Sequence, residues 1–154
     1  MDVREFRNCM GRFATGVTVV TCKTEDGYHG FTANSFTSVS LDPPLILVSV
    51  DKKTKAAEYL RNNSFAVNIL QEDQHAVAMH FAGRPNENQL FDWHESVHTV
   101  KLDRALAHIE CTPWAEYDGG DHVLFLGEVQ DFTYTTAPAL TYYAGQFSKL
   151  EHAE

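Results

Sequence analysis

The chain has 154 residues, of which 44% are apolar and 12% aromatic, enough for a core that needs neither metal nor disulfide. The formal net charge of −9 argues against nucleic-acid binding. The three cysteines are far apart and outside any CxxC pair, so we expect reduced thiols and no zinc site. We expect no signal peptide, because the first residues lack its basic start and apolar run, and we expect no membrane span, because no run of about 20 apolar residues occurs. We therefore expect a single domain over residues 1–154, cytoplasmic and not bound to a membrane.

Apolar spacing in the first third predicts a helix followed by a hairpin. Apolar residues recur every three or four positions over residues 2–13, which is typical of an amphipathic helix. The β-branched segment 17–22 precedes a turn at Glu25-Asp26-Gly27, after which residues 28–35 return as the paired strand.

Short strands and short helices then alternate. We predict strands over residues 45–50 and 65–70, and helices over residues 54–61 and 73–82. Asp73 is placed to be the N-cap of the second helix, and Gly83 with Pro85 ends it.

The last third is rich in strands. Residues 84–96 are polar with a few aromatic side chains and predict an ordered surface loop. Strands are expected over residues 107–117 and 122–134, with a final piece around Tyr142 and Tyr143. Many strands with few helices favour a mainly β fold with short helices, arranged as a barrel.

Residues 30–40 concentrate hydroxyl and amide side chains after a glycine. Such a run is suited to hydrogen-bonding a planar polar heterocycle, although an exposed threonine-rich strand has the same composition. The sequence lacks GxGxxG, GxxxxGK[ST] and GxSxG motifs, which disfavours Rossmann, P-loop and α/β-hydrolase enzymes.

Two further places carry candidate functional groups. Lys52, Lys53 and Lys55 lie between a predicted strand and helix, where an anion such as phosphate is favoured, but a solvated turn has the same composition. His122 follows Gly119-Gly120-Asp121 at a strand start, where a turn can present its imidazole to a pocket or to solvent. We expect no metal site, because the spaced pair His94 and His98 has no third ligand nearby.

Taken in order, several segments resemble the short-chain flavin reductase family, in particular the reductase components of phenol and 4-hydroxyphenylacetate monooxygenases. They are residues 12–21 (RFATGVTVVT), 32–36 (TANSF), 42–45 (DPPL), 65–70 (FAVNIL), 81–83 (FAG), 120–122 (GDH), Pro138 and 142–145 (YYAG). The resemblance extends over nearly the whole chain.

The resemblance implies an FMN-binding split β-barrel that forms a homodimer, with flavin near the subunit interface. By position, the flavin ring would contact Thr32, Ala33, Asn34 and Ser35. The ribityl and phosphate would lie at Ser49, Val50, Lys52, Lys53 and Thr54, and the pocket would be completed by Phe81, Ala82 and Gly83. His122 would face the nicotinamide as the catalytic candidate.

The activity implied is hydride transfer from NADH or NADPH to FMN or FAD, with reduced flavin passed to a partner oxygenase that hydroxylates an aromatic compound. A protein with tightly bound prosthetic FMN, either an electron carrier or a pyridoxamine-phosphate-oxidase-like enzyme, is the alternative from the same fold family. A binding module without turnover is the alternative from another class. Flavin-dependent oxidation of nicotinamide would distinguish the three.

Overall fold

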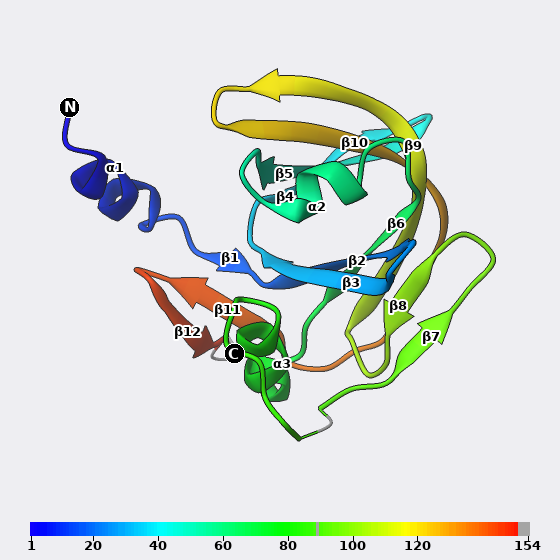
Figure 1. The fold of residues 1–154 in the computed structure, drawn as a ribbon. Helices are drawn as coiled ribbons and strands as arrows, with labels where there is room; N and C mark the ends of the chain where they lie inside the picture. The colour runs from blue at the N-terminus through cyan, green and yellow to red at the C-terminus, as the bar shows by residue number, and fades with distance from the viewer. Residues whose placement is uncertain (89, 151–154) are drawn as a thin grey trace.

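The fold is built on one antiparallel sheet, and the computed structural model describes residues 1–88 and 90–150. The seven strands have the spatial order β3 (Gly27–Ala33), β2 (Thr18–Thr24), β6 (Phe65–Ile69), β9 (Ala107–Gly119), β10 (His122–Tyr134), β5 (Pro44–Asp51) and β4 (Phe36–Leu41). The sheet curves strongly, so that β3 and β4 approach each other (Figure 1). These edge strands do not pair, so the strands of the described chain do not form a closed barrel.

Short elements surround this sheet. The helices are α1 (Val3–Met10), α2 (Lys55–Tyr59) and α3 (His75–His80), with a 3-10 turn η1 (Glu72–Gln74) before α3. A second sheet contains β1 (Thr15–Gly16), β11 (Leu140–Tyr143) and β12 (Gln146–Lys149), and a third pairs β7 (Trp93–Glu95) with β8 (Val100–Leu102). The prediction of a mainly β fold with short helices is confirmed.

The predicted hairpin forms, but its second strand is shorter than expected. β2 and β3 pair from Thr18 opposite Ala33 to Thr24 opposite Gly27. The strand stops at Ala33, and the chain turns before β4 begins at Phe36. The run of hydroxyl residues therefore lies on both sides of a break between two strands that occupy opposite edges of the sheet.

Three other boundaries differ from the sequence prediction. Helix α1 ends at Met10 instead of residue 13, because Gly11 is its C-cap. The assignment of Asp73 as an N-cap is wrong: Gln71 caps η1 in a capping box with Gln74, and Asp73 accepts a hydrogen bond from Arg104. Three residues of the predicted surface loop form β7, a strand too short to show alternation in the sequence.

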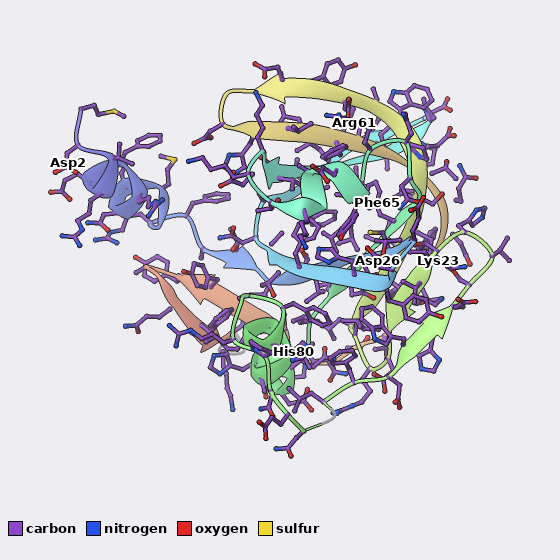
Figure 2. The ribbon with its side chains drawn as sticks, in the orientation of Figure 1. Asp2, Lys23, Asp26, Arg61, Phe65 and His80 are labelled. Atoms are coloured by element: carbon purple, nitrogen blue, oxygen red, sulfur yellow. The ribbon has the colours of Figure 1, made fainter. Side chains whose placement is uncertain are left out.

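The core holds apolar side chains and a satisfied polar centre. Phe65 is 1% exposed and lies inside the curved sheet, whereas Asp2 marks the helix that projects from it (Figure 2). The fully buried Asn68 amide donates to Val19 O at 2.8 Å, and its Oδ1 accepts from Leu102 N at 2.9 Å. These bonds tie β2, β6 and β8 together. They also satisfy an amide that would carry its full desolvation cost if it were buried without partners.

The cysteines are free thiols, of which Cys9 is exposed and Cys22 and Cys111 are buried. Burial raises the pKa of Cys22 to about 11 and that of Cys111 to about 12, so both stay protonated at neutral pH.

None of the helices in the described residues has the length and apolar content of a transmembrane segment. The same residues include no group of three or more His, Cys, Asp and Glu side chains able to hold a metal ion.

Helix α1 leaves its apolar face uncovered. Val3, Phe6 and Met10 of the helix, and Phe13 shortly after it, are each at least 48% exposed, and no residue of the helix is buried. The helix projects from the body of the chain (Figure 1). An apolar stripe of this kind is typical of a surface that another protein covers.

Gly127→Ala tests the tightest packing in the core. A Cβ at this position would lie 2.6 Å from Cys111 Cβ and 2.7 Å from Phe65 Cζ. We expect a loss of about 1–3 kcal/mol in the free energy of unfolding, measured by urea denaturation, because the close-packed core cannot yield enough space. Gly16→Ala is the matched control, since no atom lies within 4 Å of its added Cβ. Equal denaturation midpoints in the two variants would contradict the packing.

Candidate functional site

The break between β3 and β4 is where three cavities meet. The hairpin cavity, of about 690 Å³, lies between β3, α3 and the β11–β12 hairpin. The sheet cavity, of about 630 Å³, lies between the start of β4, β5 and residues 13–16. The helix cavity, of about 1200 Å³, lies against α1 and residues 11–13. Asn34 lines all three, which makes it the centre of the candidate site.

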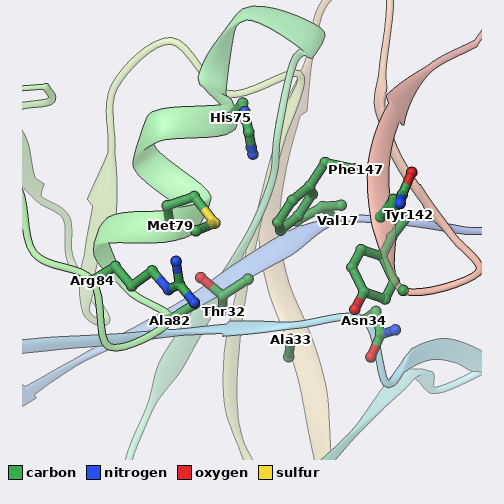
Figure 3. A pocket seen from close by; sticks show the side chains of 12 residues that line it. Val17, Thr32, Ala33, Asn34, His75, Met79, Ala82, Arg84, Tyr142 and Phe147 are labelled. Carbon is green, nitrogen blue, oxygen red and sulfur yellow. The ribbon is translucent and has the colours of Figure 1, made fainter. Parts of the chain in front are cut away.

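Four of the predicted site residues line the hairpin cavity. These are Thr32, Ala33, Asn34 and Ala82. Figure 3 shows Arg84 and Met79 on one side of this cavity and Tyr142 with Phe147 on the other. Three of the four residues of the predicted ring-binding segment, Thr32, Ala33 and Asn34, thus lie along one wall of this cavity.

The sheet cavity holds two further predicted residues, Ser35 and Ser49, beside Asn34. Ser35 Oγ donates to Ser49 O at 2.8 Å, and Ser49 N donates to Ser35 O at 3.1 Å. This double link holds the chain after the break against β5 and fixes where Asn34 lies.

Hydrogen bonds already made within the chain decide which groups remain for a ligand. Thr32 Oγ1 donates to Ala78 O at 2.6 Å, and Ser35 Oγ is occupied as above, so neither hydroxyl proton is free. The backbone N–H groups of Asn34 and Ser35 donate to no acceptor in the described part of the chain, nor does the Asn34 amide. Donors at this junction therefore come from the backbone, from the Asn34 amide and from the Thr15 hydroxyl, which is buried without a partner among the described residues, and not from the hydroxyls of Thr32 and Ser35.

Most of the predicted segment 81–83 packs behind the wall of the hairpin cavity and does not line the cavity itself. Phe81 O accepts from Thr32 N at 3.2 Å, and a Cβ on Gly30 would lie 2.8 Å from the Phe81 ring. The ring packs on Phe91 with centroids 4.9 Å apart. Gly83 has a φ of +86°, a conformation that glycine adopts at little cost. Only Ala82 of the three reaches the cavity lining.

The predicted phosphate segment lies at the same end of the sheet, but apart from Ser49 its residues line none of the three cavities. Val50 is 3% exposed and belongs to the core. Lys52 pairs with Asp118, and this contact holds the pKa of the Asp118 carboxyl below its usual range. Lys53 N donates to Asp51 Oδ1 at 2.8 Å, and Thr54 Oγ1 donates to Asp51 O at 2.8 Å. The Lys53 ammonium has no ion pair among the described residues.

His122 starts β10 directly opposite Asp51. Its Nδ1 lies 2.7 Å from Asp121 Oδ1, and the pKa of that carboxyl is lowered mainly by this contact and also by the charge of Lys53. If Nδ1 carries the hydrogen, Asp121 orients the ring and leaves Nε2 for a ligand. His122 therefore lies about 7 Å along β5 from Ser49 at the usual strand rise, because its partner Asp51 is two residues beyond Ser49. Lys53 follows in the turn after β5, where its charge acts on Asp121.

Several residues that the sequence analysis did not single out belong to the hairpin cavity. They are His75, Met79, Arg84 and Phe147, while Val17 and Tyr142 were named only within predicted strands and motifs of the family resemblance and given no role in the site. His75 and Met79 are four positions apart on α3, so both face the same way. The one signal in the sequence that could have pointed to this cavity was the cationic side chain of Arg84, directly after the helix.

Comparisons with known proteins agree with this arrangement. The flavin reductase like domain matches residues 10–151. An NADH-dependent flavin reductase from a Rhodococcus species is 44% identical over 151 residues, covering 94% of this chain and 85% of that protein. The reductase component of 4-hydroxyphenylacetate 3-monooxygenase from Thermus thermophilus is 35% identical, covering 94% and 95%.

Among solved structures, flavin reductase PheA2 superposes with a TM-score of 0.94 at 42% identity, covering 99% of this chain and 100% of that one. The named relatives are oxidoreductases that use flavin or are reductase components of monooxygenases. Sequence and fold agree over nearly the full length, and the chain belongs to the flavin reductase family.

Proposed function

We propose that this chain is a flavin reductase that uses NADH or NADPH to reduce FMN or FAD and supplies the reduced flavin to a separate oxygenase, an aromatic hydroxylase. The observation that carries the proposal is the break at Asn34, where unpaired donors open onto adjoining cavities. The family relationship and the monooxygenase reductase among its relatives support the direction of the reaction and the kind of partner.

The flavin ring would lie at the β3–β4 break. The free N–H groups of Asn34 and Ser35, with the Asn34 amide, suit the carbonyl edge of the ring, where negative charge develops on reduction. Donors fixed by the Ser35–Ser49 link need no rearrangement to stabilise that charge. The unpaired Lys53 ammonium and the Thr54 turn would hold the flavin phosphate.

His122 would position the nicotinamide. Hydride transfer is chemistry that the two cofactors supply, so the chain needs only to hold their rings together and exclude other geometries. An imidazole oriented by Asp121 can hydrogen-bond a carboxamide or pyrophosphate through Nε2. This role needs no proton transfer from the protein to the reacting atoms.

A second copy of the chain would complete the site. Lys53 and His122 line none of the three cavities within one chain, although they lie at the same end of the sheet as Asn34. The uncovered apolar face of α1 adjoins the helix cavity, which also reaches Asn34. In a homodimer, this face would be buried on the partner, and a barrel split between β3 and β4 would hold flavin near the interface.

Residues 1–154 would act as one domain in a reducing, cytoplasmic setting, which the three free cysteines support. As a co-substrate the flavin would bind with modest affinity, because the reduced form has to leave. A prosthetic flavin would instead stay bound through turnover.

Desalted protein tests the activity. We expect NADH or NADPH oxidation that depends on added FMN, FAD or riboflavin, measured by loss of nicotinamide absorbance, because the site binds flavin reversibly. Heat-denatured protein is the control. Stoichiometric yellow flavin after desalting, without turnover on added flavin, would favour the prosthetic alternative. An absence of both would favour a binding module.

Lys53→Ala and His122→Ala test the two ends of the site separately. Loss of one charge-assisted hydrogen bond predicts about a tenfold rise in the flavin KM for Lys53→Ala. His122→Ala should instead raise the nicotinamide KM more than the flavin KM. Lys23→Ala is the matched control, since Lys23 lies 3.8 Å from Glu95 in an exposed pair outside the site. Wild-type kinetics in both variants would remove these residues from the site.

Replacing Phe6 and Met10 together by serine tests the dimer. We expect the wild-type protein to have the mass of a dimer by light scattering, and the double variant to shift towards monomer and bind FMN more weakly, because the apolar face of α1 loses its contact. Val97→Ser is the control, since Val97 is 93% exposed in a loop away from α1. A monomeric wild-type protein with full activity would contradict the proposal.

A further inference from the structure

The chain that follows α3 folds back on the helix and carries Ala82 and Arg84, two residues of the hairpin cavity. Gly83 has a φ of +86°, and Arg84 N donates to Met79 O at 3.1 Å. A left-handed glycine with a hydrogen bond that reaches five residues back is the Schellman ending of a helix. This ending fixes the backbone as far as Arg84, whose side chain points into the cavity (Figure 3), but it holds nothing beyond that residue.

The residues beyond Arg84 are held by His80, the last residue of α3 (Figure 2). Asn86 N donates to His80 Nδ1 at 3.0 Å. The imidazole also packs edge-on against the rings of Phe81 and Phe91, with centroids 4.9 Å and 5.3 Å away. Within the described chain, the Asn86 bond is the one hydrogen bond that joins residues 85–88 to any other segment. His80 therefore sets the path of the chain after the helix.

The hydrogen bond from Asn86 also fixes the state of the imidazole. A backbone N–H can only donate, so Nδ1 has to offer its lone pair, and the hydrogen of the neutral ring lies on Nε2. A second proton would bind at Nδ1 and place two donors against each other. Protonation of His80 therefore removes the acceptor, so the hold on residues 85–88 exists at higher pH and is lost as the pH falls.

No carboxylate fixes the charge of His80 by direct pairing, since the ring makes no ion pair in residues 1–88 and 90–150. The other titratable or charged side chains on α3 and on the segment that packs against the ring are His75, Arg84, Glu87 and Asp92. Histidine changes its charge between about pH 5 and pH 8. Of the two histidines on this helix, His80 is the one whose ring accepts a hydrogen bond from the chain that follows.

We propose that His80 is a positioning residue whose protonation state controls the hairpin cavity. The neutral imidazole keeps residues 85–88 against α3 and Arg84 at the cavity, and the imidazolium releases them. His80 acts through Arg84, because its own side chain lies outside the described lining. The consequence rests on the function proposed above, since flavin and nicotinamide substrates carry phosphate and Arg84 has no ion pair among the described residues. Binding of one substrate should therefore weaken in acid.

Nuclear magnetic resonance (NMR) of the isotope-labelled full chain tests the hold without turnover. In the wild type, the Asn86 amide resonance should shift with the same midpoint as the His80 ring, and the amide should lose its protection from hydrogen exchange once His80 is protonated. His80→Asn places an amide oxygen near the position of Nδ1, which accepts a hydrogen bond but does not titrate. In this variant the Asn86 amide should stay protected, with a constant shift, from about pH 5.5 to about pH 8.

Steady-state kinetics test the consequence. His80→Phe keeps a ring between Phe81 and Phe91 but offers no acceptor, and should raise the KM of one substrate about threefold at every pH. The wild type should match His80→Asn near about pH 8 and His80→Phe near about pH 5.5. His122 titrates in all three proteins, so its effect cancels in the comparison. In an Arg84→Gln background the His80 variants should no longer differ, because His80 acts through Arg84.

His94→Asn is the matched control, since His94 is an exposed histidine on β7. It should keep the wild-type dependence of KM on pH. Identical pH profiles in the wild type and His80→Asn, or an Asn86 amide that does not follow the His80 titration, would overturn the inference while the reductase function stands. If the wild type shows no flavin-dependent turnover, the proposed function fails, and the NMR titration still decides whether His80 holds residues 85–88.

Discussion

The arrangement of the site depends on how Thr32 joins β3 to α3. Its N–H donates to Phe81 O and its hydroxyl to Ala78 O, so one residue occupies two carbonyls at the C-terminal end of a six-residue helix. The Phe81 ring can then lie over Gly30, where a side chain would collide with it. A helix this short has little stability of its own, and these contacts hold it in place. The hairpin cavity exists because α3 is held at this distance from the sheet.

The break after β3 has the opposite character, because it leaves groups unpaired. Strands usually satisfy their backbone donors through neighbours, and β3 and β4 lie at the two edges of the sheet without pairing to each other. Asn34 and Ser35 therefore keep free N–H groups where cavities meet, while the Ser35–Ser49 link keeps the segment from moving. Fixed, unpaired donors are what a preorganised site for a polar ring requires.

Positive charge lies on both sides of this break in an otherwise acidic chain. Lys53 lies in the turn after β5, where its charge acts on Asp121, and Arg84 lies beyond α3 in the hairpin cavity. Lys52 differs from both, since Asp118 already neutralises it. Two unpaired cations separated by a donor-rich junction suit a ligand or ligand pair with phosphate at both ends. The exposed apolar face of α1 adjoins this surface, because the helix cavity that it lines also reaches Asn34.

The sequence by itself determined the class of the fold, the β2–β3 hairpin and the family, because β-branched runs, turn residues and ordered motifs are local signals. It could not determine that the strand expected over residues 28–35 stops at Ala33, since the hydroxyl run looks the same on both sides of the break. Nor could it show that Thr32 and Ser35 use their protons internally, or that Phe147 and Arg84 face each other. Those facts depend on contacts between residues far apart in the chain, which only the tertiary structure decides.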